Sequence, residues 1–253
     1  MEFYSNETIK MTIPFSNAAS IHLILETIAF FVGIRVYYFL RKDFQDPISD
    51  MNRLWILLGA MIGALLGSRI IALFENPNEI VHQTWLTFYQ NKTVAGGFFG
   101  GLFGVELCKK LIGVKIASGD IYVIPILTAL IIGRIGCFGM GVLEPTYGIE
   151  TTFFTGMNLG DGKLRHPVAL YEIITMALLI IGFTMIKKKS FQNGDKFKMF
   201  MIAYFLYRFL VEFVKPYNSL FWNLSVIHWI SIFIFVYYHQ FFTRISKPVF
   251  NAK

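Results

Sequence analysis

The clearest feature of this sequence is the length of its apolar stretches. Seven stretches of about 20 predominantly apolar residues lie near 20–40, 54–74, 94–112, 118–138, 168–187, 198–214 and 222–243. A helix of about 20 such residues spans the hydrocarbon core of a bilayer. The pattern therefore predicts an all-α integral membrane protein with about seven transmembrane helices.

These stretches follow one another along the whole chain, so residues 1–253 are expected to form a single transmembrane domain. The first stretch is not preceded by a basic n-region or followed by a small-residue cleavage site, so we expect it to remain as a helix. The longest connection, at 139–167, is rich in glycine and is expected at the outer face. Connections of this length are often functional.

The composition supports a membrane protein. The chain is 55% hydrophobic and 15% charged, with a mean hydropathy of +0.55. Soluble domains are nearer about 45–50% apolar and about 25% charged. The apolar surface is therefore expected to face lipid.

The net charge of +7 would suit a nucleic-acid partner, but its distribution argues against one. If loops alternate sides, one side carries Arg41, Lys42, Arg53, Lys109, Lys110, Lys115, Lys187, Lys188, Lys189, Lys196, Lys198, Arg244, Lys247 and Lys253. The other side carries only Lys10, Lys92, Lys163, Arg165 and Lys215. Cytoplasmic loops are typically enriched in Lys and Arg. This bias predicts an N-terminus outside and a C-terminus in the cytoplasm, and no nucleic-acid partner.

The two cysteines, Cys108 and Cys137, both lie in apolar stretches. They do not form a C-x-x-C pair or a Cys/His metal spacing. We expect inert buried thiols, with no disulfide and no metal site.

Several charged residues interrupt the apolar stretches: Arg69, Glu106, Arg134, Arg208 and Glu212. A charge at membrane depth costs at least about 2.5–3.5 kcal/mol on insertion scales, which indicates that these side chains are used. Their simplest use is to hold an anionic group in or beside the bilayer. Arg69 and Glu106 are instead expected to pair across helices for structure.

Arg134 is the strongest candidate for an anion site. A guanidinium stays charged at any ordinary pH, and Gly133 and Gly136 beside it would let a lipid headgroup approach. The structural alternative is an arginine that extends to the interface or pairs with Glu144.

The glycine-rich block at 96–104 has two interpretations. Its repeated G-x-x-x-G spacing is typical of close helix–helix packing. Alternatively, Gly96 and Gly97 expose backbone N–H groups near a helix start, where the helix dipole favours a phosphate.

Arg165-His166-Pro167 opens the fifth apolar stretch, with Tyr171 and Glu172 about one turn inside. A proline suits the first turn of a helix. His166 near Glu172 is a candidate for acid–base work or substrate binding.

Two further pairs are four residues apart, so each shares a helix face. Arg208 and Glu212 either neutralise each other or act on a substrate. His22 and Glu26 lie near the outer end of the first stretch, where a catalytic role is one interpretation.

Together these motifs resemble the prolipoprotein diacylglyceryl transferase family of bacterial inner-membrane enzymes, over most of the chain. The matching runs are Gly-Arg-Ile-Gly-x-Phe at 133–138, Arg-His-Pro-x-x-Leu-Tyr-Glu at 165–172 and Arg-x-x-x-Glu-Phe at 208–213. The chain departs from the family pattern at several positions. Ala95 stands where the family has histidine, Cys137 where it has asparagine, and Ile24 where it has tyrosine. Val168-Ala169 replaces a polar pair, and Glu144 is the acidic residue nearest to the family's acidic position, from which it is shifted along the chain.

The resemblance implies transfer of a diacylglyceryl group from phosphatidylglycerol to the lipobox cysteine of a prolipoprotein signal peptide, in the bacterial cytoplasmic membrane. It suggests Arg134 for the phosphate and Glu212 for orienting Arg208. Arg208 is either a second clamp or the group that lowers the pKa of the acceptor thiol. With Ala95 in place of histidine, His166 is the first candidate base, and His22 with Glu26 the second. No metal or cofactor is expected.

The other residues expected to contact substrate are Gly96, Gly97, Gly133, Gly136, Glu144, Tyr171 and Glu172. Two alternative functions fit the same residues. One is a membrane transferase of the same scaffold with a different acceptor. The other is a lipid-binding or transport protein that is not an enzyme and uses the arginines to grip anionic headgroups.

Overall fold

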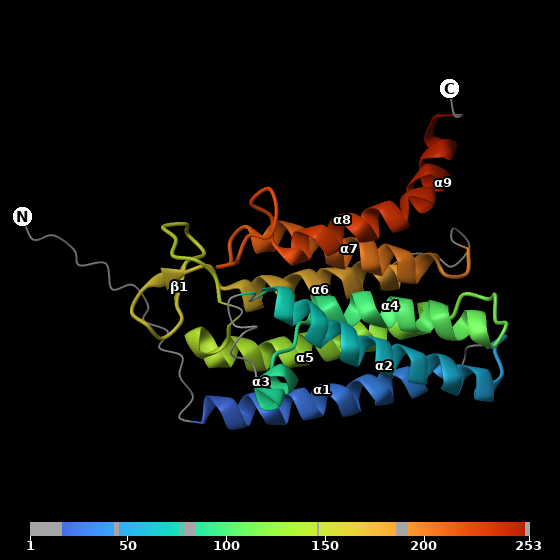
Figure 1. Ribbon diagram of the computed structural model, residues 1–253, viewed down its shortest axis with the longest axis horizontal. Helices are drawn as coiled ribbons and strands as arrows, with labels where there is room; N and C mark the ends of the chain where they lie inside the picture. The colour runs from blue at the N-terminus through green and yellow to red at the C-terminus, as the bar shows by residue number, and fades with distance from the viewer. Residues whose placement is uncertain are drawn as a thin grey trace, which may run out of the picture. The chain divides into compact units, whose positions relative to one another are not determined.

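The computed structural model describes residues 17–42, 46–75, 77, 84–145, 147–185 and 192–250 (Figure 1). The described helices are α1 (Ala18–Arg41), α2 (Asp50–Glu75), α3 (Trp85–Gln90), α4 (Val94–Leu111), α5 (Val123–Met140), α6 (Val168–Met185), α7 (Asp195–Glu212), α8 (Val226–Tyr237) and α9 (His239–Phe250). Short 3₁₀ turns, η2 (Asp120–Tyr122) and η3 (Gly141–Leu143), flank α5. The strands β1 (Met157–Asn158) and β2 (Leu164–Arg165) pair antiparallel.

Six of the seven apolar stretches form helices within a few residues of the predicted ends. Four helical segments are long and apolar enough to cross a membrane: α1, α2, residues 120–143 and α6. The helices α4 and α7 are also 18 residues long but carry more charged residues, and α8 is shorter. The protein is therefore a mostly helical membrane protein, while the count of seven spans stays a prediction.

The last predicted stretch, 222–243, is not one helix. Trp222 and Asn223 have positive φ angles of 52° and 54°, which belong to a turn. Ser225 then starts α8, because its hydroxyl accepts a hydrogen bond from the His228 N–H, a favourable N-cap. A turn at Tyr238 ends α8, and α9 leaves at a steep angle (Figure 1). Hydropathy alone could not reveal these two interruptions.

Contacts divide the chain into two compact units that alternate along the sequence. The described parts of 1–36, 124–185 and 214–216 form the first unit. The described parts of 37–123, 186–213 and 217–253 form the second unit. The first unit thus holds α5, α6 and most of α1, and the second unit holds α2, α4, α7 and α8.

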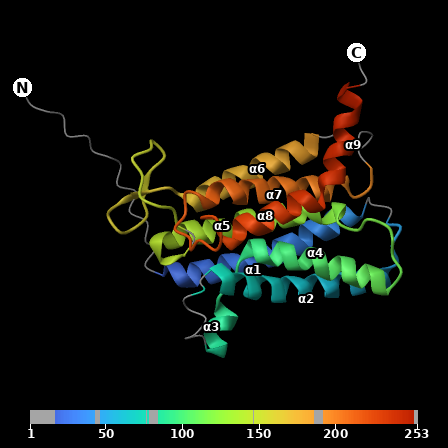
Figure 2. The same cartoon turned by 45° about the horizontal axis from the view of Figure 1, so that its top comes forward.

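In the second unit, α2 and α4 lie side by side and antiparallel (Figures 1 and 2). A Cβ atom on Gly96 would lie 2.6 Å from the Gly67 carbonyl oxygen, and one on Gly104 would lie 2.1 Å from the Gly59 oxygen. Such contacts require bare backbone on both helices. The helix-packing interpretation of the glycine block is therefore confirmed.

The antiparallel register also corrects the expected pair between Arg69 and Glu106. Because Gly67 meets Gly96, Glu106 lies about ten residues, or roughly 15 Å, further along α4. Arg69 instead donates to the Ser68 hydroxyl at 2.7 Å, and Glu106 pairs with Lys109 at 3.4 Å.

In the first unit, two close backbone contacts shape the connection between α5 and α6. Gly141 has a φ of +57°, and a Cβ there would lie 2.1 Å from the Leu159 oxygen. A Cβ on Gly148 would lie 2.4 Å from the His166 oxygen. The predicted long connection is thus a folded loop with a small β-hairpin, held against the start of α6 at His166.

Candidate functional site

The centre of the first unit is a buried ion pair between α5 and α6. The Arg134 Nε lies 2.9 Å from the Glu172 Oε2, with Arg134 6% exposed and Glu172 1% exposed. Removing either partner would leave the other charge buried, which is strongly unfavourable. The pair therefore fixes a permanent positive charge at a defined position beside apolar helices.

From the sequence, pairing with Glu144 was a structural alternative for Arg134, and Glu172 was considered as a neighbour of His166. In the structure, Glu172 pairs with Arg134, and Glu144 lies against His22. The reason is that α6 brings its second turn to α5, a long-range contact that sequence spacing does not encode.

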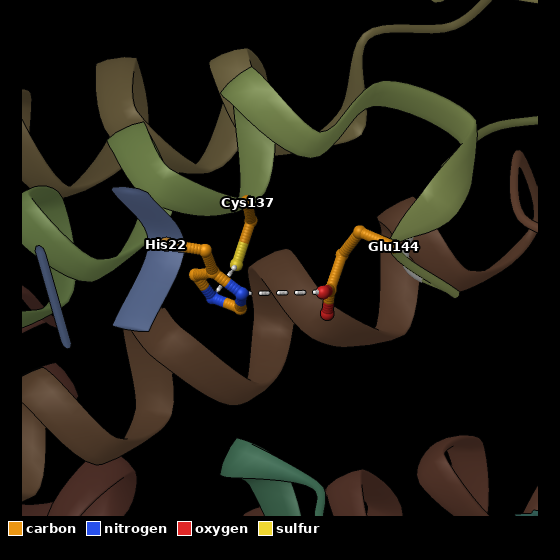
Figure 3. Close-up of side chains that lie close together, drawn as sticks. All are labelled: His22, Cys137 and Glu144. Carbon is orange, nitrogen blue, oxygen red and sulfur yellow. Dashed lines mark hydrogen bonds and ion pairs between the residues drawn. The ribbon is translucent and has the colours of Figure 1, made fainter. Parts of the chain in front are cut away.

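Figure 3 shows the His22 imidazole between the Cys137 thiol and the Glu144 carboxylate. Its Nε2 lies 3.6 Å from the Cys137 Sγ, and its Nδ1 lies 3.8 Å from the Glu144 Oε2. The Glu26 Oε1 is 3.6 Å from Nε2, so the predicted shared face of His22 and Glu26 is confirmed. The imidazole thus has a thiol and two carboxylates around it.

Local sequence explains why these groups meet. Gly136 lets α1 approach α5, because a Cβ there would lie 2.8 Å from the His22 Cδ2 and 3.3 Å from its Cα. Arg134 and Cys137 are three apart on α5, and the Arg134 Nη1 donates to the Cys137 Sγ at 3.4 Å. His22, Cys137 and Glu144 bring three ligand-type atoms within 4.8 Å of one another. Sequence reasoning missed this cluster because its members come from α1, α5 and the loop after η3.

His166, the first candidate base, lies at the start of α6. Its Nδ1 is 3.1 Å from the Tyr171 hydroxyl, which in turn lies 2.5 Å from the Thr155 hydroxyl. The structure therefore joins His166 to Tyr171, a contact that the sequence analysis did not predict. Thr155 is an additional member of this group that no motif indicated.

Arg165, next to His166, is held at the hairpin. Its Nε donates to the Asp161 carboxylate at 2.8 Å, and its guanidinium lies over the Tyr147 ring at 5.0 Å. The hydrogen bond from Arg165 lowers the pKa of Asp161 below its ordinary value of 3.8. This ion pair fixes the loop that leads into His166.

The second unit contains another buried arginine–glutamate pair. The Arg208 Nη2 donates to the Glu212 Oε2 at 3.3 Å, and the residues are 3% and 2% exposed. The pairing follows from their spacing on α7, so the mutual neutralisation considered from sequence occurs. Glu212 also accepts from the Ser225 hydroxyl at 3.2 Å.

His228 extends this second pair and was missed by sequence reasoning. It is fully buried, and its Nδ1 lies 3.0 Å from the Ser225 hydroxyl. The signal was present in the Ser-x-x-His spacing at 225–228, which places a histidine in the first turn of a helix. A polar chain therefore runs from Arg208 through Glu212 and Ser225 to His228.

The predicted substrate-contacting glycines have different surroundings. Gly96 packs on α2, and the Gly97 N–H donates to the Thr93 oxygen at 3.0 Å, so it is used within the helix. A Cβ on Gly133 would meet no atom within 4 Å. Of these three, only Gly133 has open space beside its Cα, and it is adjacent to Arg134 in the chain.

The fold and these groups define a class: a helical, multi-pass membrane protein that buries arginine–carboxylate pairs in apolar helices, suited to holding an anionic lipid group. The chain belongs to the prolipoprotein diacylglyceryl transferase family, whose sequence model matches residues 14–243.

Three relatives illustrate the similarity; each is named phosphatidylglycerol–prolipoprotein diacylglyceryl transferase. The protein from Campylobacter jejuni strain 81-176 is 27% identical over 93% of this chain and 94% of its own length. The protein from Wolbachia sp. subsp. Brugia malayi (strain TRS) is 31% identical over 69% of this chain and 66% of its own length. The Nitratidesulfovibrio vulgaris protein is 32% identical over 68% of this chain and 65% of its own length.

Proposed function

We propose that this protein transfers the diacylglyceryl group of phosphatidylglycerol to the thiol of a lipobox cysteine in a prolipoprotein signal peptide. The observation that carries this proposal is the buried Arg134–Glu172 pair, in a chain of this family. The reaction forms a C–S bond and breaks the bond between the diacylglyceryl carbon and the phosphate oxygen. Glycerol phosphate leaves.

Arg134 is proposed to stabilise the charge that develops on the leaving phosphate. A fixed donor aimed at developing charge is usually the largest single contribution to catalysis. Glu172 holds the guanidinium in position through its Nε. The Nη groups are proposed to bind the phosphate, since a guanidinium binds phosphate through paired N–H groups.

The acceptor thiol must lose its proton during the transfer. His166 is proposed as the base, with its Nδ1 against the Tyr171 hydroxyl. His22, beside Glu26 and Glu144, is the second candidate. Each has polar partners that would orient the ring and support the imidazolium that forms.

Arg208 is proposed as a second clamp on anionic substrate, oriented by Glu212. Tyr171 and Glu144 are proposed to contribute hydrogen-bonding groups. Gly133 is proposed to give access to Arg134, and Gly136 to admit the His22 side chain beside it. Gly96 and Gly97 are proposed to contact substrate only by their position in the first turn of α4. No cofactor or metal enters the reaction.

We further propose a single transmembrane domain of about seven spans in the bacterial cytoplasmic membrane. The positive-inside distribution supports an N-terminus outside and a cytoplasmic C-terminus. The loop at 139–167 is then on the outer side, where secreted prolipoproteins would arrive.

The test is an intact-mass assay with purified protein, phosphatidylglycerol vesicles and a synthetic lipobox peptide. We expect a diacylglyceryl mass gain on the peptide cysteine. A peptide with serine in place of that cysteine, and vesicles of phosphatidylethanolamine, are the matched controls and should give no product.

The alternatives give different results in the same assay. Bound phosphatidylglycerol and a folded protein, with no lipidated peptide, would overturn the proposal. Release of glycerol phosphate without lipidated peptide would indicate a different acceptor. Lipid binding without any lipid turnover would indicate a carrier.

A further inference from the structure

The cluster of His22, Cys137 and Glu144 has the arrangement of a nucleophile, a base and an orienting acid (Figure 3). We propose that it is a second reactive site, at which the Cys137 thiol takes an acyl group from an ester of the bound lipid. This proposal rests on the proposed function only for the position of the lipid, which Arg134 would hold by its phosphate.

The geometry assigns the roles. The thiol faces Nε2 and the Glu144 carboxylate faces Nδ1, so the two partners use opposite nitrogens of one ring. Carboxylates lie near both ring nitrogens, Glu144 at Nδ1 and Glu26 at Nε2, and in the tautomer with its proton on Nδ1 the Nε2 atom can accept the thiol proton. The Sγ–Nε2 distance is within hydrogen-bond range for sulfur, and the Nδ1–Oε2 distance is longer than a hydrogen bond, as is common for catalytic groups without substrate.

The neighbours of the cluster support charge development. Glu26 lies 3.6 Å from Nε2, so an imidazolium would meet a carboxylate on each side. The Arg134 Nη1 donates to the sulfur at 3.4 Å, which favours negative charge on it. Cys137 is only 8% exposed, and burial favours the neutral thiol, so proton transfer to His22 accompanies attack.

The thiol lies beside apolar residues. Cys137 and Phe138 line a small apolar pocket together with Gly141, Leu159 and Val168. An acyl ester lies only a few bonds from the phosphate of a phospholipid. A lipid held by its phosphate at Arg134 would therefore bring an ester carbonyl near Sγ, 3.4 Å from that guanidinium.

A metal site is the competing interpretation of these three side chains. An ion bound by these three side chains would be placed beside the Arg134 cation, which repels it. This repulsion favours the triad.

The proposed step balances without an oxidant or a reductant. The Cys137 proton passes to Nε2 as Sγ bonds to the ester carbonyl carbon. The C–O bond then breaks, and His22 returns the proton to the leaving alkoxide, which releases a lysophospholipid. Water next adds to the thioester carbon, giving its proton to Nε2, and the C–S bond breaks to release a fatty acid and the thiol.

The experiment incubates the full-length protein with phosphatidylglycerol vesicles, without peptide, and quenches in acid. We expect a mass gain of one acyl group, mapped to Cys137 by peptide analysis and removed by neutral hydroxylamine, which cleaves thioesters but not thioethers. Lysophospholipid and fatty acid are measured in the same samples.

Three variants sharpen the experiment. Cys137→Ser should lose the adduct, while Cys108→Ser, the matched thiol on α4, should keep it. His22→Gln should slow acylation at least about 100-fold, the usual contribution of a general base. Because the wild-type adduct is mapped directly, the test stands even if Cys137→Ser fails to fold.

The proposal is overturned if Cys137 carries no hydroxylamine-sensitive acyl group, or if His22→Gln acylates at the wild-type rate. A hydroxylamine-resistant diacylglyceryl group on Cys137 would also overturn it. Adding lipobox peptide separates the two proposals. Lipidated peptide without acylated Cys137 leaves the transferase standing, and acylated Cys137 without lipidated peptide leaves only the triad.

Discussion

Glycine has different uses at the α2–α4 contact and in the C-terminal half of α5. On α4, Gly104 lets two helices of the second unit touch backbone to backbone. On α5, Gly136 makes room for the His22 side chain, and Gly133 faces open space. The first arrangement builds a scaffold, and the second admits reactive groups beside the charged pair of Arg134 and Glu172. Glycine in an apolar helix therefore indicates that another group approaches closely, but it does not tell whether that group is a helix backbone or a side chain.

The largest expected effect comes from breaking the charged pair at α5. Glu172→Leu leaves the Arg134 guanidinium buried without this carboxylate, which should cost about 3–5 kcal/mol. For a chain of this size that lowers Tm by roughly 10 °C, measurable by thermal unfolding in detergent. Glu106→Leu, at a half-exposed glutamate, is the matched control and should change Tm little.

The next effect tests the scaffold. Gly104→Val places side-chain atoms against the Gly59 carbonyl, where even a Cβ would be 2.1 Å away. We expect a loss of about 3 kcal/mol, at the upper end for overpacking. Gly101→Ala on the same helix meets only ordinary contacts, at 3.6 Å or more, and should be tolerated. Equal stability of the two variants would contradict the backbone contact.

A smaller effect separates the two glycines of α5. Gly136→Ala must displace His22 and should cost about 1–2 kcal/mol, together with most of the acylation of Cys137. Gly133→Ala has no atom to meet and should stabilise the helix by up to about 1 kcal/mol. Thermal unfolding and intact-mass analysis of both variants test this difference. Equal stability and equal acylation of the two variants would contradict the assigned contact between Gly136 and His22.

The smallest effect concerns the surface loop. The pKa of Asp161 is lowered by its hydrogen bond from Arg165, so its stabilising contribution is present above its ordinary pKa and is lost as pH falls through the lower folded-state value. Asp161→Asn should therefore cost less than about 1 kcal/mol at pH 7. The difference from wild type should shrink in acid, and a difference that grows in acid would contradict the assigned sign.

The sequence predicted what depends on local spacing. Apolar length located six helices, the G-x-x-x-G pattern indicated helix packing, and the four-residue spacing paired Arg208 with Glu212. It could not predict the Arg134–Glu172 pair or the contact of Glu144 with His22, because these join segments distant in sequence. It also joined α8 and α9 into one span, since the turn at Tyr238 lies among apolar residues.

The departures from the family pattern are informative in the same way. Cys137 and the shifted Glu144 are two separate departures from the family pattern in the sequence, and in the structure both lie beside the His22 imidazole. Ala95, which replaces the family histidine, is fully buried on α4. The proposed bases are therefore histidines whose partners become visible only in the folded chain.

The most direct test of the central claim is the rate of peptide lipidation after Arg134→Gln, compared with Arg35→Gln. Arg35 is an exposed arginine on α1, so it controls for loss of one cation from an apolar helix. We predict a loss of at least about 10²–10³-fold for Arg134→Gln, as for removal of a donor to developing charge, and a nearly unchanged rate for Arg35→Gln. Equal rates for both variants would contradict the role of Arg134.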